Sequence, residues 1–256
     1  MTAPHWIDGP AGAPVIVLAH SLGTSSALWE LQVEPLAATH RVLRYDLRGH
    51  GAASVPPGPY SVDDLGRDVL DLLDALELER VSFCGISLGG AIAMWLGLHA
   101  PERLERLVLA CASPRFGTAE LWSERAATVR ANGVVPLVDA ALERWFAADF
   151  RARRPDVVAH FRELLLSTPA EGYAACCDAL RDWDVRGQLA EIAVPTLVVA
   201  GNEDVVSPPA EAELLAAEIP LGSVTVLAGA AHLANVDQPD AFNQAVLDYL
   251  SHEEAA

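Results

Sequence analysis

The sequence Gly85-Ile86-Ser87-Leu88-Gly89 stands between an apolar run of strand length, 81–84, and an apolar segment of helical length, 88–99. A Gly-x-Ser-x-Gly pattern in this setting is typical of a nucleophile elbow, a sharp turn that holds a serine at the end of a buried strand. The turn strains the serine backbone, and the flanking glycines avoid clashes with neighbouring chain. The pattern therefore makes Ser87 a candidate nucleophile. The alternative is a glycine-rich tight turn with an idle serine.

Outward from this turn, short runs rich in β-branched residues alternate with longer segments of helical spacing. Because the short runs are continuously apolar, we expect strands buried on both faces. They are 15–19, 41–45, 81–84, 107–110, 196–200 and 223–227. The expected helices are 27–38, 62–77 (after a Ser61–Asp64 capping box), 88–99, 210–218 and 240–250. The alternation predicts an α/β fold with a mostly parallel central sheet and helices on both faces.

The alternation lapses between residues 114 and 190. This segment contains helical patterns and no convincing strand, and the patterns lie at 121–130, 137–146, 157–166 and 170–181. We therefore expect 114–190 to form an inserted helical cap, with 1–113 and 191–256 forming the core.

The charge of the chain limits its partners. It has 35 acidic residues and 17 basic ones, all arginine, for a formal net charge of −18, and 52% of its residues are hydrophobic. This composition predicts a folded protein that binds neither nucleic acid nor an anionic membrane. Segment 114–190 holds ten arginines and eleven acidic residues, so nearly all the negative charge lies on the core. A small anion entering under the cap is not excluded.

The N-terminal sequence has no basic region and only one short apolar run, which argues against a signal peptide or a spanning helix and favours a cytoplasmic protein. The four cysteines show neither CxxC spacing nor a disulfide framework, so we expect them to be small packing residues. They are Cys84, Cys111, Cys176 and Cys177.

A serine nucleophile needs a histidine base, and in this arrangement the histidine comes last in the chain, just after a strand. Of the eight histidines, His232 fits because it follows the expected strand 223–227. His99 ends a helix and His252 lies in a polar tail, so both are expected to be solvated.

The base in turn needs an acid to orient it. Asp204 follows the strand 196–200 with the spacing Gly201-x-x-Asp204, which places it at the tip of a turn. The neighbouring Glu203 is the alternative, more typical of a solvated loop charge. Asp46 comes too early in the chain, and its loop charges are interpreted as loop-fixing pairs.

The oxyanion of an acyl-transfer reaction needs two donors, one from the residue after the nucleophile and one from the loop after an earlier strand. Leu88 supplies the first N–H. The loop His20-Ser21-Leu22-Gly23 follows the strand 15–19, and its second donor is expected from Leu22. The alternative for this loop is a plain turn, and His20 is expected to be a packed loop histidine.

Together these residues resemble the α/β-hydrolase superfamily over nearly the whole chain. Within it the sequence is similar to the 3-oxoadipate enol-lactone hydrolases, with Ile86 and Leu88 where Leu and Met are usual. The similar stretches are 44–51, Val55-Pro56-Pro57-Gly58-Pro59-Tyr60, the elbow with 90–93, Tyr173-Ala174-Ala175-Cys176-Cys177, 180–182, 231–236 and 238–239. Stretch 44–51 and the elbow also occur in esterases and haloperoxidase-like hydrolases. The resemblance to the enol-lactone hydrolases in particular rests on the proline-rich stretch and the cap stretch.

The resemblance implies cleavage of a cyclic enol ester with a carboxymethyl group, in aromatic compound degradation, by a Ser87, Asp204 and His232 triad. It implies no metal or organic cofactor. One cap arginine is expected to bind the substrate carboxylate, with Arg130 and Arg144 as candidates, and Trp122 and Trp145 are candidate pocket walls. The plainer interpretation makes them surface arginines and core tryptophans.

Other functions stay open at this point. The same triad would serve a carboxylesterase, a carbon–carbon bond hydrolase or a perhydrolase, and the fold alone would serve a non-catalytic lactone receptor. The sequence does not indicate an oligomeric state.

Overall fold

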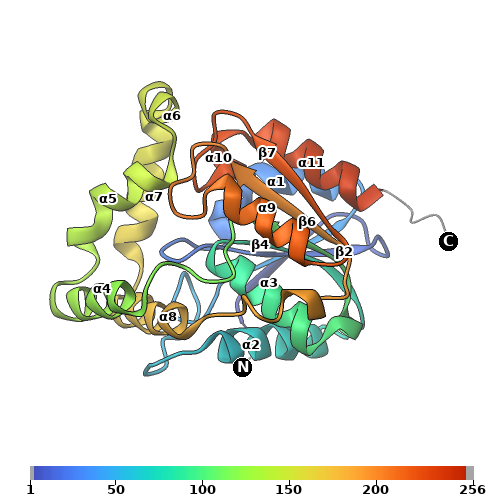
Figure 1. Ribbon diagram of the computed structural model, residues 1–256, viewed down its shortest axis with the longest axis horizontal. Helices are drawn as coiled ribbons and strands as arrows, with labels where there is room; N and C mark the ends of the chain where they lie inside the picture. Colours follow the sequence, from blue (N-terminus) through green and yellow to red (C-terminus); the bar gives the residue numbers. More distant parts are fainter. Residues whose placement is uncertain (1–2, 252–256) are drawn as a thin grey trace.

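The computed structural model describes residues 3–251, and within them one seven-stranded sheet forms the centre (Figure 1). The strand order is β1-β3-β2-β4-β5-β6-β7, and all neighbours are parallel except β1 and β3. The strands are β1 (His5–Asp8), β2 (Val15–Ala19), β3 (Arg41–Tyr45), β4 (Val81–Ile86), β5 (Leu104–Ala110), β6 (Thr196–Gly201) and β7 (Gly222–Leu227). The mostly parallel sheet of the prediction is confirmed.

The two edges of the sheet differ from expectation. The half-exposed strand β1 has no continuous apolar run, so the sequence pattern did not predict it. The prediction that 223–227 is buried on both faces is wrong, because β7 is an edge strand in which Val224 and Val226 are 40% and 42% exposed. Within the described chain β7 pairs with a single strand, β6.

The core helices lie close to their predicted positions, except the four-residue helix Ala234–Asp237, which was not predicted. They are α1 (Glu30–Ala37), α2 (Val62–Ala75), α3 (Leu88–His99), α9 (Pro209–Glu218), α10 (Ala234–Asp237) and α11 (Pro239–Ser251), with short 3-10 turns η1 (Ser26–Trp29), η2 (Pro101–Arg103) and η4 (Leu189–Glu191). The expected helix 27–38 is thus a 3-10 turn followed by α1. The capping box at the start of α2 is confirmed, since Ser61 Oγ accepts the Asp64 N–H and the Asp64 carboxylate accepts the Ser61 N–H.

A group of helices between β5 and β6 projects to one side of the sheet (Figure 1). They are α4 (Ala119–Asn132), η3 (Val135–Leu137), α5 (Val138–Trp145), α6 (Ala148–Arg153), α7 (Pro155–Ser167) and α8 (Ala170–Asp182). The sequence pattern missed α6, which is only six residues long. We call these helices the cap, and α4 packs closely along α8.

The cysteines are free and buried, as expected. No helix within residues 3–251 combines the length and the apolar character needed to cross a lipid bilayer. The predicted solvated His252 lies outside the described residues.

Candidate active site

Ser87 occupies the tight turn between β4 and α3 in a strained conformation, with φ +55° and ψ −111°. Its N–H donates to the Ala110 carbonyl at 3.0 Å. A Cβ at Gly85 would lie 2.0 Å from the Gly89 carbonyl oxygen, and one at Gly89 would lie 2.2 Å from the Ala19 carbonyl oxygen. Both positions therefore require glycine, as the elbow pattern predicts.

Three side chains from distant parts of the chain meet at this turn. Ser87 Oγ lies 2.9 Å from His232 Nε2, and His232 Nδ1 lies 2.8 Å from Asp204 Oδ2. A carboxylate can only accept, so Nδ1 carries the proton of the neutral ring and Nε2 is free to accept from the serine hydroxyl. All three residues are buried. This is the geometry of a nucleophile, a base and an orienting acid.

Asp204 accepts more hydrogen bonds than the one from His232. Its Oδ1 accepts from the N–H groups of Val206 and Ser207 at 2.7 and 3.1 Å, and its Oδ2 accepts from Ser207 Oγ at 2.9 Å. Burial acts to raise the pKa of Asp204, but His232 and these donors hold that pKa below its ordinary value. The alternative acid, Glu203, is exposed. Ser207 was missed at the sequence level, although its place three residues after Asp204 is typical of such a turn.

The loop after β2 carries Leu22, which lines a cavity beside Ser87 and His232. Leu88 is the first residue of α3, so its N–H has no acceptor within that helix. The structure thus brings Leu22 close to the serine, and it puts Leu88 at the position that the oxyanion prediction requires.

Two buried histidines, His20 and His50, hold the loop after β2 in place. His20 Nε2 accepts the Leu47 N–H and His50 Nε2 accepts the Gly23 N–H, both at 3.0 Å. Burial lowers the pKa of His20 to about 4 and that of His50 to about 3, so both rings are neutral at pH 7 and keep the lone pairs that accept these bonds.

Asp46 has the loop-fixing contacts that the sequence predicts. Its carboxylate accepts the N–H groups of Ser26 and Ala52, both at 2.8 Å. The residue therefore ties the chain after β3 to the first residue of η1.

The cavity at Ser87 has a volume of about 320 Å³, near the small end of the roughly 300–1,000 Å³ range of ligand pockets. Core residues form its floor and cap residues its roof. It is lined by Ser21, Leu22, Ser87, Phe116, Gly117, Leu121, Trp122, Arg125, Ala141, Arg144, Trp145, Tyr173, Leu180, Val205, Val206 and His232. Of the candidate cap residues, Trp122, Arg144 and Trp145 are thus in the cavity lining.

Arg130 is placed elsewhere. Its guanidinium pairs with Glu171 and Asp178, at 3.1 and 2.6 Å, and it does not line the cavity. Arg125 lies there instead and was missed at the sequence level. Arg125 is three residues from Trp122 on the same helix, so both lie on the same face. This spacing could have indicated Arg125 as a residue of the cavity.

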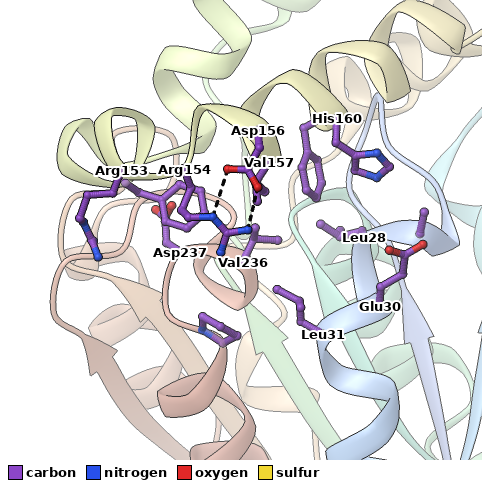
Figure 2. Close-up of a pocket in the computed structure, with 14 residues that line it drawn as sticks. Leu28, Glu30, Leu31, Arg153, Arg154, Asp156, Val157, His160, Val236 and Asp237 are labelled. Atoms are coloured by element: carbon purple, nitrogen blue, oxygen red, sulfur yellow. Dashed lines mark hydrogen bonds and ion pairs between the residues drawn. The ribbon is translucent and has the colours of Figure 1, made fainter.

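A second cavity, of about 430 Å³, lies between α6–α7 of the cap and the η1–α1 region of the core (Figure 2). None of the triad residues lines it. Asp237 borders it and joins the two parts, because its Oδ2 accepts the N–H groups of Ala231 at 2.7 Å and of Ala147 at 3.0 Å. Asp237 thereby links the segment that precedes His232 to the cap.

In residues 3–251 no three His, Cys, Asp or Glu side chains gather in a way that could hold a metal ion.

The comparisons with known proteins agree with this fold. A family model described as alpha/beta hydrolase fold matches residues 14–239, and the chain belongs to that family. It is 42% identical to 3-oxoadipate enol-lactonase 2 of Acinetobacter baylyi, over 93% of this chain and 89% of that protein. It also superposes on the crystal structure of the enol-lactonase from Burkholderia xenovorans LB400 with a TM-score of 0.95 and 41% identity, covering 97% of this chain and 96% of that one.

A relative of another activity is somewhat more distant. A putative carbamate hydrolase of Pseudomonas savastanoi is 32% identical, over 94% of this chain and 95% of that protein. The chain is therefore a hydrolase of the α/β fold whose relatives include enol-lactonases.

Proposed function

We propose that this protein hydrolyses 3-oxoadipate enol-lactone to 3-oxoadipate through Ser87, His232 and Asp204, a step in the breakdown of aromatic compounds. The observation that carries the proposal is the chain of hydrogen bonds from Ser87 Oγ through His232 to Asp204, in a chain 41–42% identical to enol-lactonases. The small cavity supports it, since it suits a compact metabolite better than a long-chain ester.

In this mechanism Ser87 Oγ attacks the lactone carbonyl while His232 Nε2 takes the hydroxyl proton. Asp204 holds the ring in the required tautomer and stabilises the imidazolium that forms. The N–H groups of Leu22 and Leu88 stabilise the oxyanion, and the strained turn holds Ser87 ready for attack.

Collapse of the tetrahedral intermediate breaks the ring C–O bond and leaves an acyl-enzyme with an enol on the same acyl chain. The imidazolium of His232 protonates the enolate oxygen, and the enol becomes a ketone. Because an enolate is a good leaving group, this step needs little general-acid catalysis. Water activated by His232 then cleaves the ester to Ser87, giving a 3-oxo dicarboxylate and the free serine.

A fluorophosphonate probe tests the serine mechanism. We expect stoichiometric labelling of Ser87, identified by peptide mass spectrometry, and loss of labelling in His232→Ala, with lactone turnover lost in both Ser87→Ala and His232→Ala. An unreactive Ser87 in the wild-type protein would contradict the proposal and favour a binding protein. Carbamate and simple-ester turnover, measured alongside, tests the activities of the other relatives and the esterase alternative.

A further inference from the structure

Two arginines face the cavity of Ser87 from the cap, Arg125 from α4 and Arg144 from α5. No acidic residue lines this cavity. Among the ion pairs of the described chain, most cap arginines, such as Arg130 and Arg181, have carboxylate partners. Four cap arginines have none there, and of these four only Arg125 and Arg144 line this cavity. The cavity thus holds two guanidinium groups without an ion-pair partner among the described residues.

This arrangement is costly without an anion. Partial burial, and then the charge of Arg125, lower the pKa of the Arg144 guanidinium, while Tyr173 and the adjacent Glu143 oppose that shift. Like charges gathered in a partly desolvated cavity are stabilised when a bound ligand supplies the opposite charge. The electrostatics of the roof therefore select a negatively charged ligand.

Aromatic residues hold the pair in place. The Arg125 guanidinium lies over the Trp122 ring, 4.6 Å from its centroid. Tyr173 is buried beside both arginines; burial raises the pKa of its phenol, and the two guanidinium charges oppose that rise. A guanidinium held against an indole is well suited to bidentate recognition of a carboxylate.

The reacting groups lie on the other side of the same cavity. Ser87 and His232 belong to the core, whereas the arginines belong to the cap. A ligand that touches both sides must carry its acyl carbon at one end and its anionic group at the other. Fixing both ends orients the carbonyl toward Ser87.

We propose that Arg125 and Arg144 together bind the free carboxylate of the substrate and make the enzyme selective for small lactones with an anionic arm. This inference rests on the proposed function for its substrate, but the arginine pair can be tested without turnover.

The kinetic test compares Arg125→Gln and Arg144→Gln with Arg162→Gln. Arg162 is a matched control because it also removes one cap charge, but its ion pair with the exposed Asp139 lies outside the cavity. We expect each cavity variant to raise KM for the enol-lactone by about tenfold to a hundredfold, as for loss of a charged hydrogen bond, with a much smaller change in kcat. Arg125→Lys should recover part of the lost affinity, because lysine keeps the positive charge but cannot donate two parallel hydrogen bonds to a carboxylate.

Neutral substrates show whether the change is specific to the anion. In the cavity variants, kcat/KM for dihydrocoumarin and p-nitrophenyl acetate should fall much less than kcat/KM for the enol-lactone. An equal loss on neutral and anionic substrates, or an unchanged KM for the enol-lactone, would overturn the proposal.

Calorimetric titration with adipate separates this inference from the proposed function. We expect the wild-type protein and Arg162→Gln to bind adipate and the Arg125→Gln/Arg144→Gln double variant to lose binding. If the lactone is not hydrolysed but adipate binding depends on the arginines, the proposed substrate is wrong and the anion site stands. If the lactone is hydrolysed and the double variant binds adipate as the wild type does, the anion site is wrong.

Discussion

Replacement of Asp204 by Asn tests the role of the acid with little change in shape. Asp204 Oδ1 accepts two backbone N–H groups, from Val206 and Ser207, while Oδ2 faces His232 Nδ1. The backbone donors will hold the amide oxygen of the new side chain at the Oδ1 position. Its NH2 group then points at His232 Nδ1, which must become an acceptor.

That exchange moves the ring proton of His232 to Nε2, the atom 2.9 Å from Ser87 Oγ. Nε2 can then no longer accept the hydroxyl proton. The expected loss is about 10⁴-fold in kcat, the size found when a triad histidine is forced into the wrong tautomer. At about 1.36 kcal/mol per factor of ten, this is a rise of about 5.4 kcal/mol in the activation barrier.

The assay is steady-state hydrolysis of the enol-lactone, with p-nitrophenyl acetate as a second substrate and near-ultraviolet circular dichroism as a check on the fold. Glu203→Gln is the matched control, because Glu203 is adjacent and exposed, and its kcat should stay within about twofold of wild type. An Asp204→Asn protein that keeps more than about a tenth of the wild-type kcat would refute the assigned acid. A large loss in the control instead would move that role to Glu203.

Three further predictions concern the elbow, the loop and the acid. Gly89→Ala forces a Cβ to within 2.2 Å of the Ala19 oxygen, so we expect about 3 kcal/mol of destabilisation in urea unfolding; an unchanged midpoint would contradict the packing argument. The pKa of His50 is lowered to about 3 in the folded state, so the unfolded chain binds more protons between pH 6.5 and 3 and acid destabilises the fold. In His50→Gln the amide oxygen can still accept the Gly23 N–H, but the side chain does not titrate. Between pH 7 and 5 the free energy of unfolding of this variant should therefore fall by about 2 kcal/mol less than that of the wild type. Equal losses would show that His50 is not neutral when buried. Ser207→Ala removes one donor to the acid and should lower kcat by roughly fivefold to tenfold with KM nearly unchanged; no change in kcat would remove Ser207 from the positioning of the acid.

The fold was largely predictable because its signals are local. The elbow requires glycine at 85 and 89 for reasons confined to one turn, and the capping box at Ser61 fixes the start of α2. The candidate triad could be named because each member follows a strand, and parallel strands end at the same edge of a sheet. The edge strands show the limit, since the exposure of β7 depends on its position in the sheet and not on its own apolar sequence.

The roof of the cavity could not be predicted in the same way. Arg125 and Arg130 lie on one helix, yet only the first faces the cavity, because the packing of α4 along α8 decides which side of α4 is covered. The same packing gives Arg130 its partners Glu171 and Asp178 on α8. A count of cap charges contains no information about which charges are already paired.

The proposal that Ser87 hydrolyses a small lactone with an anionic arm is checked by comparing kcat/KM across substrates. Purified protein should convert 3-oxoadipate enol-lactone to 3-oxoadipate, identified by mass spectrometry, with kcat/KM at least about tenfold above that for neutral lactones, simple esters and carbamates. Faster turnover of a neutral ester or a carbamate than of the enol-lactone would contradict it.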